Sequence, residues 1–191
     1  METSAIKRKR FTFFDKFFDK GWEWYFNHFP NDCLNVDCTP AYCLLSKKEV
    51  LRVKENIPNA KIVLVLRNPV ERAISVAKAN VMWYPYTIAR FSDLDRMLKC
   101  AKRIAKAQRS NYPRMIRNWR KAYGNQFYLY YFDDLVASPE KFSANLCNDL
   151  GVVDDGTVIA VSNRSPERLT IDPRVEQWLA DHFEPKIKSW N

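Results

Sequence analysis

The residues best suited to chemistry stand at the end of an apolar run, Lys61-Ile-Val-Leu-Val-Leu-Arg67. Such a run is typical of a parallel strand covered on both faces, and open α/β sheets bind ligands beyond the carboxyl ends of their strands. A helix begins directly after Arg67, because Asn68-Pro69-Val70-Glu71 supplies a cap residue and a proline at the first helical position. This helix should offer unpaired backbone N–H groups and the positive end of its dipole, with the Ser75 hydroxyl further along. The pattern predicts an anion site, and the alternative is that Arg67 only pairs with Glu71 or another carboxylate.

The rest of the chain alternates helices with strands. A capping box, Ser46-Lys47-Lys48-Glu49, opens a helix toward Asn56. Other helices are expected over residues 69–80, 93–108, 110–124, 138–151 and from 172 onward. A second strand is expected over 126–132, and a short third over 34–37. These patterns predict an α/β fold, with a small parallel sheet flanked by helices, in a single domain over residues 1–191. The first ten residues are basic, and we expect them to be flexible.

Positive charge is concentrated in one window. The chain has 31 lysines and arginines against 22 aspartates and glutamates, a net charge of +9, and residues 96–121 contain ten basic residues and no acidic one. Such a stretch indicates an anionic partner, such as a phosphorylated cofactor, an acidic glycan or a nucleic acid; the alternative is a solvated helix face. Aromatic residues near both ends of the first half could stack on sugar rings or pack in the core.

Composition narrows the class further. Apolar residues make up 47% of the chain and charged residues 28%, which excludes wholesale disorder. No apolar stretch is long enough to span a membrane, and residues 1–10 are too polar for a signal peptide. The five cysteines lack the paired spacing of a zinc site, so we expect reduced thiols and no metal. We therefore expect a cytoplasmic protein without a membrane partner.

Several segments together resemble the sulfotransferases that use 3′-phosphoadenosine 5′-phosphosulfate (PAPS). The run from Lys61 to Ser75 closely resembles their 3′-phosphate-binding motif. The other segments resemble glycan-type members, including heparan sulfate enzymes: Phe13-Phe14-Asp15, Gly21-Trp22-Glu23-Trp24-Tyr25-Phe26, Asp37-Cys38-Thr39-Pro40-Ala41-Tyr42, Arg109-Ser110-Asn111-Tyr112 and Tyr131-Phe132-Asp133-Asp134-Leu135 up to Pro139. The resemblance covers the chain from about Phe11 to its end.

The resemblance implies a fold and a set of cofactor contacts. The fold would be the three-layer sulfotransferase architecture, related to that of P-loop NTPases, without its first strand and loop. Arg67 and Ser75 match the residues that bind the 3′-phosphate of the cofactor. Tyr112 matches a cofactor-contacting tyrosine, and Arg164 lies where the family places a Lys-Gly loop over the nucleotide. The cofactor would be PAPS, with PAP as its product and no metal.

The sequence also departs from the family pattern. It contains no Pro-Lys-x-Gly-Thr-Thr loop, which in the family holds the 5′-phosphosulfate, and Arg10 stands where the family has its general base. Cys38 replaces the lysine of the Glu-Lys-Thr-Pro stretch. Candidate bases are Asp15 and Asp37. The alternative is a structural role for each: Asp15 would cap a helix, and Asp37 would form a turn. Candidate cations are those of Lys7-Arg8-Lys9-Arg10, whose alternative is a frayed terminus.

Three functions remain open on these grounds. The first is a sulfotransferase that moves a sulfuryl group from PAPS to a hydroxyl or amine, with an anionic glycan as candidate acceptor. The second is a sulfotransferase-like domain that binds a nucleotide or an anionic glycan without catalysis. The third is a basic nucleic-acid-binding module, which rests on charge and aromatic content alone, so we do not expect a nucleic acid partner.

Overall fold

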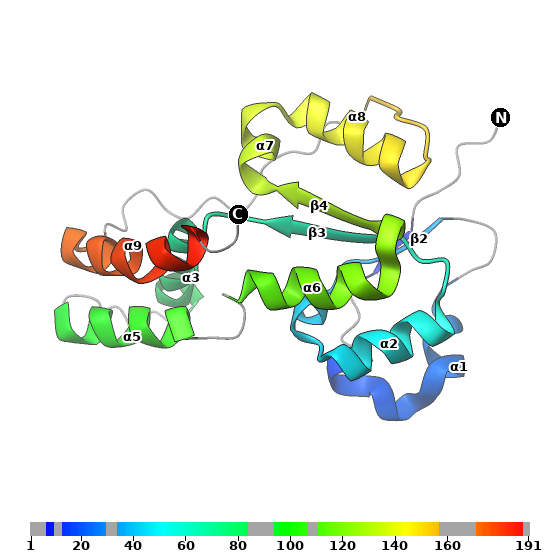
Figure 1. The fold of residues 1–191 in the computed structure, drawn as a ribbon, viewed down its shortest axis with the longest axis horizontal. Helices are drawn as coiled ribbons and strands as arrows, with labels where there is room; N and C mark the ends of the chain where they lie inside the picture. Colours follow the sequence, from blue (N-terminus) through cyan, green and yellow to red (C-terminus); the bar gives the residue numbers. More distant parts are fainter. Residues whose placement is uncertain are drawn as a thin grey trace. The chain divides into compact units, whose positions relative to one another are not determined.

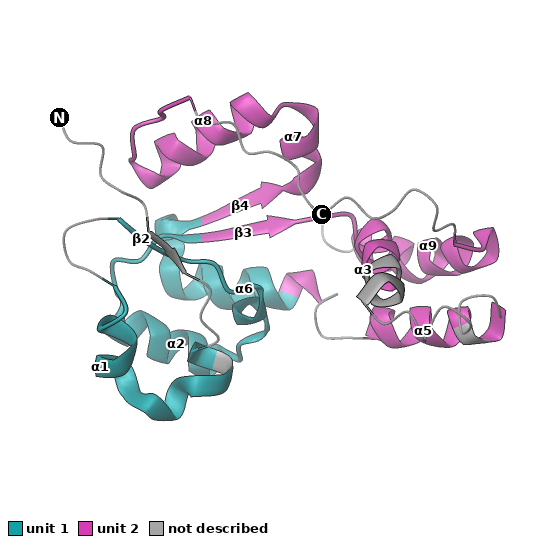
Figure 2. Ribbon diagram, turned by 180° about the vertical axis from the view of Figure 1, so that it is seen from behind, with its two compact units in different colours: residues 1–62, 114–127 teal, residues 63–113, 128–191 magenta. Residues whose placement is uncertain are grey.

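The computed structural model describes residues 7–9, 13–29, 34–83, 94–106, 111–156 and 171–188. Contacts group the chain into two compact units (Figure 2). Unit 1 comprises residues 1–62 and 114–127, and unit 2 comprises residues 63–113 and 128–191. The chain therefore passes between the units three times, and neither unit is one continuous segment. The single domain over residues 1–191 stays a prediction.

Unit 1 combines a short strand pair with helices. Its strands are β1 (Lys7–Lys9) and β2 (Asn35–Asp37), and its longest helices are α2 (Lys47–Asn56) and most of α6 (Tyr112–Tyr123). Shorter helical turns complete it: η1 (Phe13–Phe17), η2 (Phe18–Lys20), α1 (Gly21–Phe26), η3 (Pro40–Leu44) and η6 (Gly124–Gln126). Strands β1 and β2 are parallel, with Lys7 opposite Asn35 and Lys9 opposite Asp37. Part of the N-terminal segment that we expected to be flexible thus forms a paired strand.

Aromatic rings build the core of unit 1. Phe13 is fully buried, and its ring centroid lies 4.7 Å from that of Tyr25 and 5.2 Å from that of Phe14. The Trp22 ring completes the cluster at 5.5 Å from both phenylalanines. Aromatic pairs at these separations stabilise a core beyond the apolar area they bury. These rings therefore pack in the core, which was one of the two roles that the sequence suggested for its aromatic residues; the other was stacking on sugar rings.

Unit 2 holds the second strand pair, β3 (Ile62–Leu66) and β4 (Phe127–Tyr131), with the first residue of each belonging to unit 1. The two arrows run in the same direction (Figure 1). Helices α3 (Pro69–Trp83), α5 (Leu94–Lys106), α7 (Phe132–Ala137), α8 (Pro139–Leu150) and α9 (Pro173–Lys188) make up the rest. This architecture confirms the predicted α/β fold with a small parallel sheet. Within the described residues the 34–37 strand pairs with β1 rather than with β3 or β4.

Small residues let three helices of unit 2 pack closely. Ala73 and Ala77 of α3 face Ala101 and Ala105 of α5, and Leu179 and Phe183 of α9 fill the space beside them. All six side chains are at most 7% exposed. Residues without long side chains allow helix axes to approach, so this cluster fixes α3 and, with it, the turn that follows β3. Along the described ranges, no helix is both long and apolar enough to cross a bilayer.

Candidate functional site

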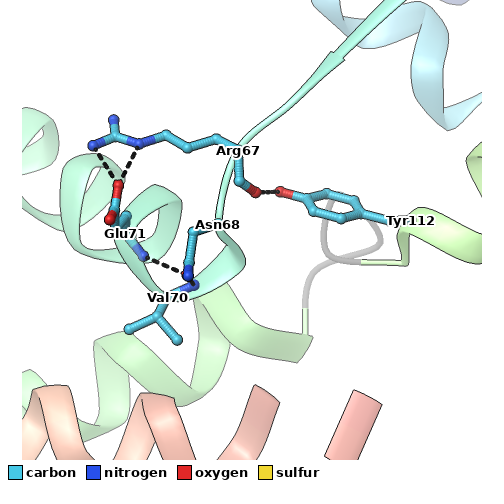
Figure 3. A network of polar contacts seen from close by, with 5 residues as sticks. All are labelled: Arg67, Asn68, Val70, Glu71 and Tyr112. Atoms are coloured by element: carbon cyan, nitrogen blue, oxygen red, sulfur yellow. Dashed lines mark hydrogen bonds and ion pairs between the residues drawn. The ribbon is translucent and has the colours of Figure 1, made fainter. Parts of the chain in front are cut away.

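The turn between β3 and α3 positions Arg67 at the carboxyl end of its strand. Strand β3 ends at Leu66, and α3 begins at Pro69. Asn68 caps the helix, because its Oδ1 accepts hydrogen bonds from the backbone N–H groups of Val70 at 2.9 Å and Glu71 at 3.4 Å (Figure 3). The cap confirms the start of the helix that the sequence predicted.

The same cap overturns one expectation about this turn. We expected unpaired N–H groups at the start of α3, but Pro69 has no N–H and Asn68 Oδ1 occupies those of Val70 and Glu71. The N–H of Arg72 already donates to the carbonyl of Asn68 at 2.9 Å. The first turn therefore has no spare backbone donor, and an anion here must be held by side chains.

Arg67 pairs with Glu71, as the second interpretation of the sequence had it. Its Nε and Nη2 both donate to Glu71 Oε2 at 3.2 Å (Figure 3). The guanidinium also lies 4.8 Å from the ring centroid of Phe132, and the Arg67 side chain remains 33% exposed. A solvent-exposed pair of this spacing contributes only about 0.3–0.5 kcal/mol. The contacts therefore orient the guanidinium, and its Nη1 can still donate to a ligand.

Tyr112 ties the start of α6 to the end of β3. Its hydroxyl donates to the backbone carbonyl of Arg67 at 2.9 Å, and its side chain is only 4% exposed (Figure 3). The structure thus brings together two of the predicted cofactor residues, Arg67 and Tyr112. The third, Ser75, is half-buried on α3, four residues after Glu71 and so on the same helix face.

The carboxylate of Asp37 is surrounded by hydroxyl donors in unit 1. Thr39 donates to its Oδ1 at 2.7 Å, while Tyr42 and Tyr25 donate to its Oδ2 at 2.8 and 3.3 Å. The backbone N–H of Phe13 in turn donates to the Tyr42 oxygen at 3.1 Å. These bonds connect four elements through one carboxylate, which favours a structural role for Asp37. Its role as a base stays a prediction.

The two tyrosines are held in their protonated form. Burial is the largest cause that raises the pKa of both Tyr25 and Tyr42 above the ordinary value, and the negative charge of Asp37 acts in the same direction. Both hydroxyls therefore remain donors to Asp37 throughout the neutral range.

The side chains of two other predicted site residues, Asp15 and Arg164, are not among the described parts of the structure. Asp15 belongs to η1 in unit 1, and its backbone alone is described there. Arg164 lies outside the described residues, as does Arg10. Lys7, Arg8 and Lys9 lie on β1. In the described part of the chain, histidine, cysteine and acidic side chains form no group of three that could hold a metal.

Comparison with known proteins decides the family. A model of the sulfotransferase family matches residues 5–155, most of the chain and parts of both units. The chain belongs to the sulfotransferase family.

Individual relatives agree with this assignment. The chain is 32% identical over 82 residues to the membrane-associated sulfotransferase kil1 of Dictyostelium discoideum, and 35% identical over 66 residues to heparan sulfate glucosamine 3-O-sulfotransferase 6 of mouse. The matches cover 40% and 33% of this chain but only 17% and 19% of those proteins, so they span less than a fifth of each relative. The crystal structure of a sulfotransferase from Alicyclobacillus acidocaldarius superposes with a TM-score of 0.62 at 19% identity. That match covers 88% of this chain and 69% of the bacterial one, which shows the shared fold.

Sequence reasoning missed one contact in this sulfotransferase that a simple signal would have found. Phe132 follows the last residue of β4 as Arg67 follows the last residue of β3. Because neighbouring parallel strands bring their carboxyl ends to one edge, the two residues meet as a cation–π pair. Arg67 and Phe132 are the last residues of the two strands expected from the sequence, and that shared position was the signal. The set of three donors to Asp37 had no such signal. Thr39 and Tyr42 are close to Asp37 in sequence, but Tyr25 comes from a separate helix.

Proposed function

We propose that this sulfotransferase takes PAPS as its donor and transfers the sulfuryl group to a hydroxyl or amine of a glycan. The observation that carries the proposal is the Arg67 turn. There, a partly exposed guanidinium stands at the carboxyl end of a parallel strand, anchored by Tyr112, in a chain of this family. The glycan as acceptor class is supported by the mouse relative, whose name gives heparan sulfate glucosamine as its substrate.

The described side chains fit the phosphate end of the cofactor. Arg67 would hold the 3′-phosphate through the guanidinium nitrogen that Glu71 leaves unused, since a fork of this kind suits phosphate oxygens. Ser75 would add a hydroxyl donor from the helix face that carries Glu71. The family resemblance adds Arg164, which lies outside the described residues, as a further cation. Tyr112 acts on the strand end by fixing the Arg67 carbonyl, because that is where its hydroxyl is bound. When bound, PAPS supplies an activated sulfuryl group and leaves as PAP.

The acceptor requires a base in addition to the cofactor site. A carboxylate must take up the proton of the acceptor hydroxyl as the oxygen attacks. Asp15 and Asp37 are the proposed bases. To accept a proton from the acceptor, Asp37 would have to lose one of the hydrogen bonds that it accepts from three hydroxyl groups. Asp15 is therefore the better candidate of the two.

A second function has an observation of its own. A sulfotransferase-fold domain that binds nucleotide or anionic glycan without catalysis would need neither base nor phosphosulfate loop. The Asp37 carboxylate already accepts hydrogen bonds from three hydroxyl groups, which favours this second function because a carboxylate held in this way is less suited to act as a base.

Calorimetric titration with PAP, on the wild type and on Arg67→Ala, tests the nucleotide site. Loss of a charge-assisted contact to phosphate should cost about 1.5–3 kcal/mol, roughly tenfold or more in affinity. Arg103→Ala, at an exposed position of α5, is the matched control and should bind PAP as the wild type does. An Arg67→Ala variant with undiminished affinity would overturn the assigned phosphate site.

A transfer assay separates the two functions. Radiolabelled PAPS is incubated with an unsulfated glucosamine-containing oligosaccharide, and labelled glycan is measured. Labelled product that disappears in Asp15→Ala supports the sulfotransferase and its base. PAP binding with no labelled product on any hydroxyl or amine acceptor establishes the binding domain instead.

A further inference from the structure

A pocket of about 170 Å³ lies in unit 1, between α2 and α6. The pocket residues of both helices belong to unit 1, and the two helices lie side by side (Figure 2). Asn118 links them, because its side-chain amide donates to the carbonyl of Leu45, just before α2, at 3.3 Å. The lining residues are Lys47, Leu51, Arg117, Asn118, Lys121 and Ala122.

Three of these six side chains are cations, and none is acidic. Lys47, Arg117 and Lys121 are all exposed, and the structure shows no ion pair for any of them among the described residues. Two other cations of α2, by contrast, do have partners. Arg52 lies 4.2 Å from the ring centroid of Phe18, and Lys54 Nζ donates to Pro58 and Gln126 at 2.7 Å.

The positions of the pocket cations work against local stability. Arg117 and Lys121 are four residues apart on α6, a spacing at which like charges repel by a few tenths of a kcal/mol. Lys47 is the first residue of α2, where the helix dipole disfavours positive charge. A bound anion would offset both the repulsion between Arg117 and Lys121 and the unfavourable helix dipole at Lys47. The arrangement therefore favours binding of an anionic ligand.

The shape of the pocket indicates the class of ligand. Leu51, which is 42% exposed, and Ala122 give the pocket an apolar wall against which the C–H face of a sugar ring can pack. Arg117 offers a planar fork for a sulfate or carboxylate. No aromatic ring lines the pocket, whereas single-stranded nucleic acids are held by stacking on aromatic side chains.

We propose that the pocket between α2 and α6 binds a sulfate or carboxylate group of an acidic glycan, at a site separate from the nucleotide contacts of Arg67. Lys47, Arg117 and Lys121 hold the anionic group, and Leu51 carries the adjoining sugar ring. The proposal rests on the proposed function only in taking the glycan to be of the acceptor's class. Binding itself requires no PAPS.

The test is calorimetric titration with a fully sulfated heparin hexasaccharide, at low and at physiological salt. We expect Lys47→Ala/Arg117→Ala/Lys121→Ala to lose about tenfold or more in affinity. The matched control is Lys48→Ala/Lys99→Ala/Lys141→Ala, which removes three exposed cations that do not line the pocket and should lose less than about twofold. Circular dichroism of both variants verifies that the fold is kept. Equal losses in the two variants would overturn the proposal, because binding would then follow net charge alone.

Further titrations fix the ligand and separate this site from the nucleotide site. An unsulfated hexasaccharide should bind the wild type far more weakly, and inorganic sulfate or oligouridylate that competes as well as the sulfated hexasaccharide would overturn the glycan assignment. PAP should bind the pocket variant as it binds the wild type. Arg67→Ala should bind the hexasaccharide normally. Failure of PAP binding in the wild type with intact hexasaccharide binding would remove the proposed function and leave this site standing.

Discussion

Glu71 is the residue whose charge bears most directly on whether Arg67 can hold a phosphate. Its Oε2 accepts both Nε and Nη2 of Arg67 at 3.2 Å, so a phosphate bound to the same guanidinium would lie close to a carboxylate. We expect Glu71→Gln to bind PAP more tightly by about 1 kcal/mol, roughly fivefold, with a smaller gain at high salt. Glu140→Gln, an exposed glutamate of α8, is the calorimetric control and should leave the affinity unchanged. Weaker binding by Glu71→Gln would show that the ion pair serves mainly to orient Arg67.

Tyr123 makes the stability of unit 1 sensitive to alkaline pH. Its side chain is 3% exposed, its hydroxyl donates to the carbonyl of Ile57 at 3.2 Å, and burial raises its pKa from 10.0 to about 12. Between pH 10 and about 12, Tyr123 therefore keeps its hydroxyl proton in the folded state but loses it in the unfolded state. The resulting stabilisation is complete below pH 10 and disappears as the pH rises from 10 toward 12.

Urea unfolding of the wild type and of Tyr123→Phe over this pH range measures the effect. The free energy of unfolding of the wild type should fall by up to about 1.4 kcal/mol per pH unit more steeply than that of Tyr123→Phe. Two parallel curves would contradict the assignment of the raised pKa to Tyr123.

Helix α2 shows how a local sequence signal fixes an element. Ser46 Oγ accepts from the N–H of Glu49 at 3.3 Å, and Glu49 Oε2 accepts from the N–H of Ser46 at 2.6 Å, so the capping box expected from the sequence is confirmed. Ser46→Ala should lower the free energy of unfolding by about 1 kcal/mol, because an N–H of the first turn loses its acceptor. Ser46→Asp restores an acceptor and should recover most of the loss in the same urea titration. A Ser46→Asp variant as unstable as Ser46→Ala would mean that the cap contributes nothing.

Elements with local signals could be predicted, and long-range pairings could not. The starts of α2, α3 and α8 and the span of β3 follow from cap residues, prolines and an aliphatic run. The pairing of β2 with β1 depends on two segments some thirty residues apart, and the short helix α7 begins where the sequence suggested only the end of a strand. The error at α3 has a physical cause as well. Asn68 was recognised as the cap, yet a cap uses the same N–H groups that an anion would need.

The candidate site was predictable to a similar degree. Arg67 and Tyr112 are brought together as neighbours of one strand end, which strand direction and family resemblance both indicate. The Arg67–Glu71 pair was weighed as an alternative because helical residues four apart face each other. The environment of Asp37 depends on Tyr25, a partner from another element, and no sequence pattern gives such a contact.

At the scale of the whole molecule, the two units are interleaved along one chain. Three elements contain residues of both units, since the boundaries fall within β3, within α6 and within β4. Unfolding either unit therefore removes backbone hydrogen bonds from elements that the other unit also uses. This continuity predicts that the units unfold together, as one cooperative transition.

Hydrogen exchange on a variant of one unit tests this prediction in the other. Leu179 of α9 is 1% exposed in the core of unit 2, so Leu179→Ala should destabilise the protein by about 2–5 kcal/mol. If the units are coupled, the slowest-exchanging amides of α2, in unit 1, should lose as much protection as those of α9.

The comparison requires exchange by global unfolding, which is recognised by equal protection at the most protected amides of both units in the wild type. Undiminished protection in α2 beside a large loss in α9 would show that unit 1 stays folded without unit 2. The pocket between α2 and α6 would then belong to an independently stable body.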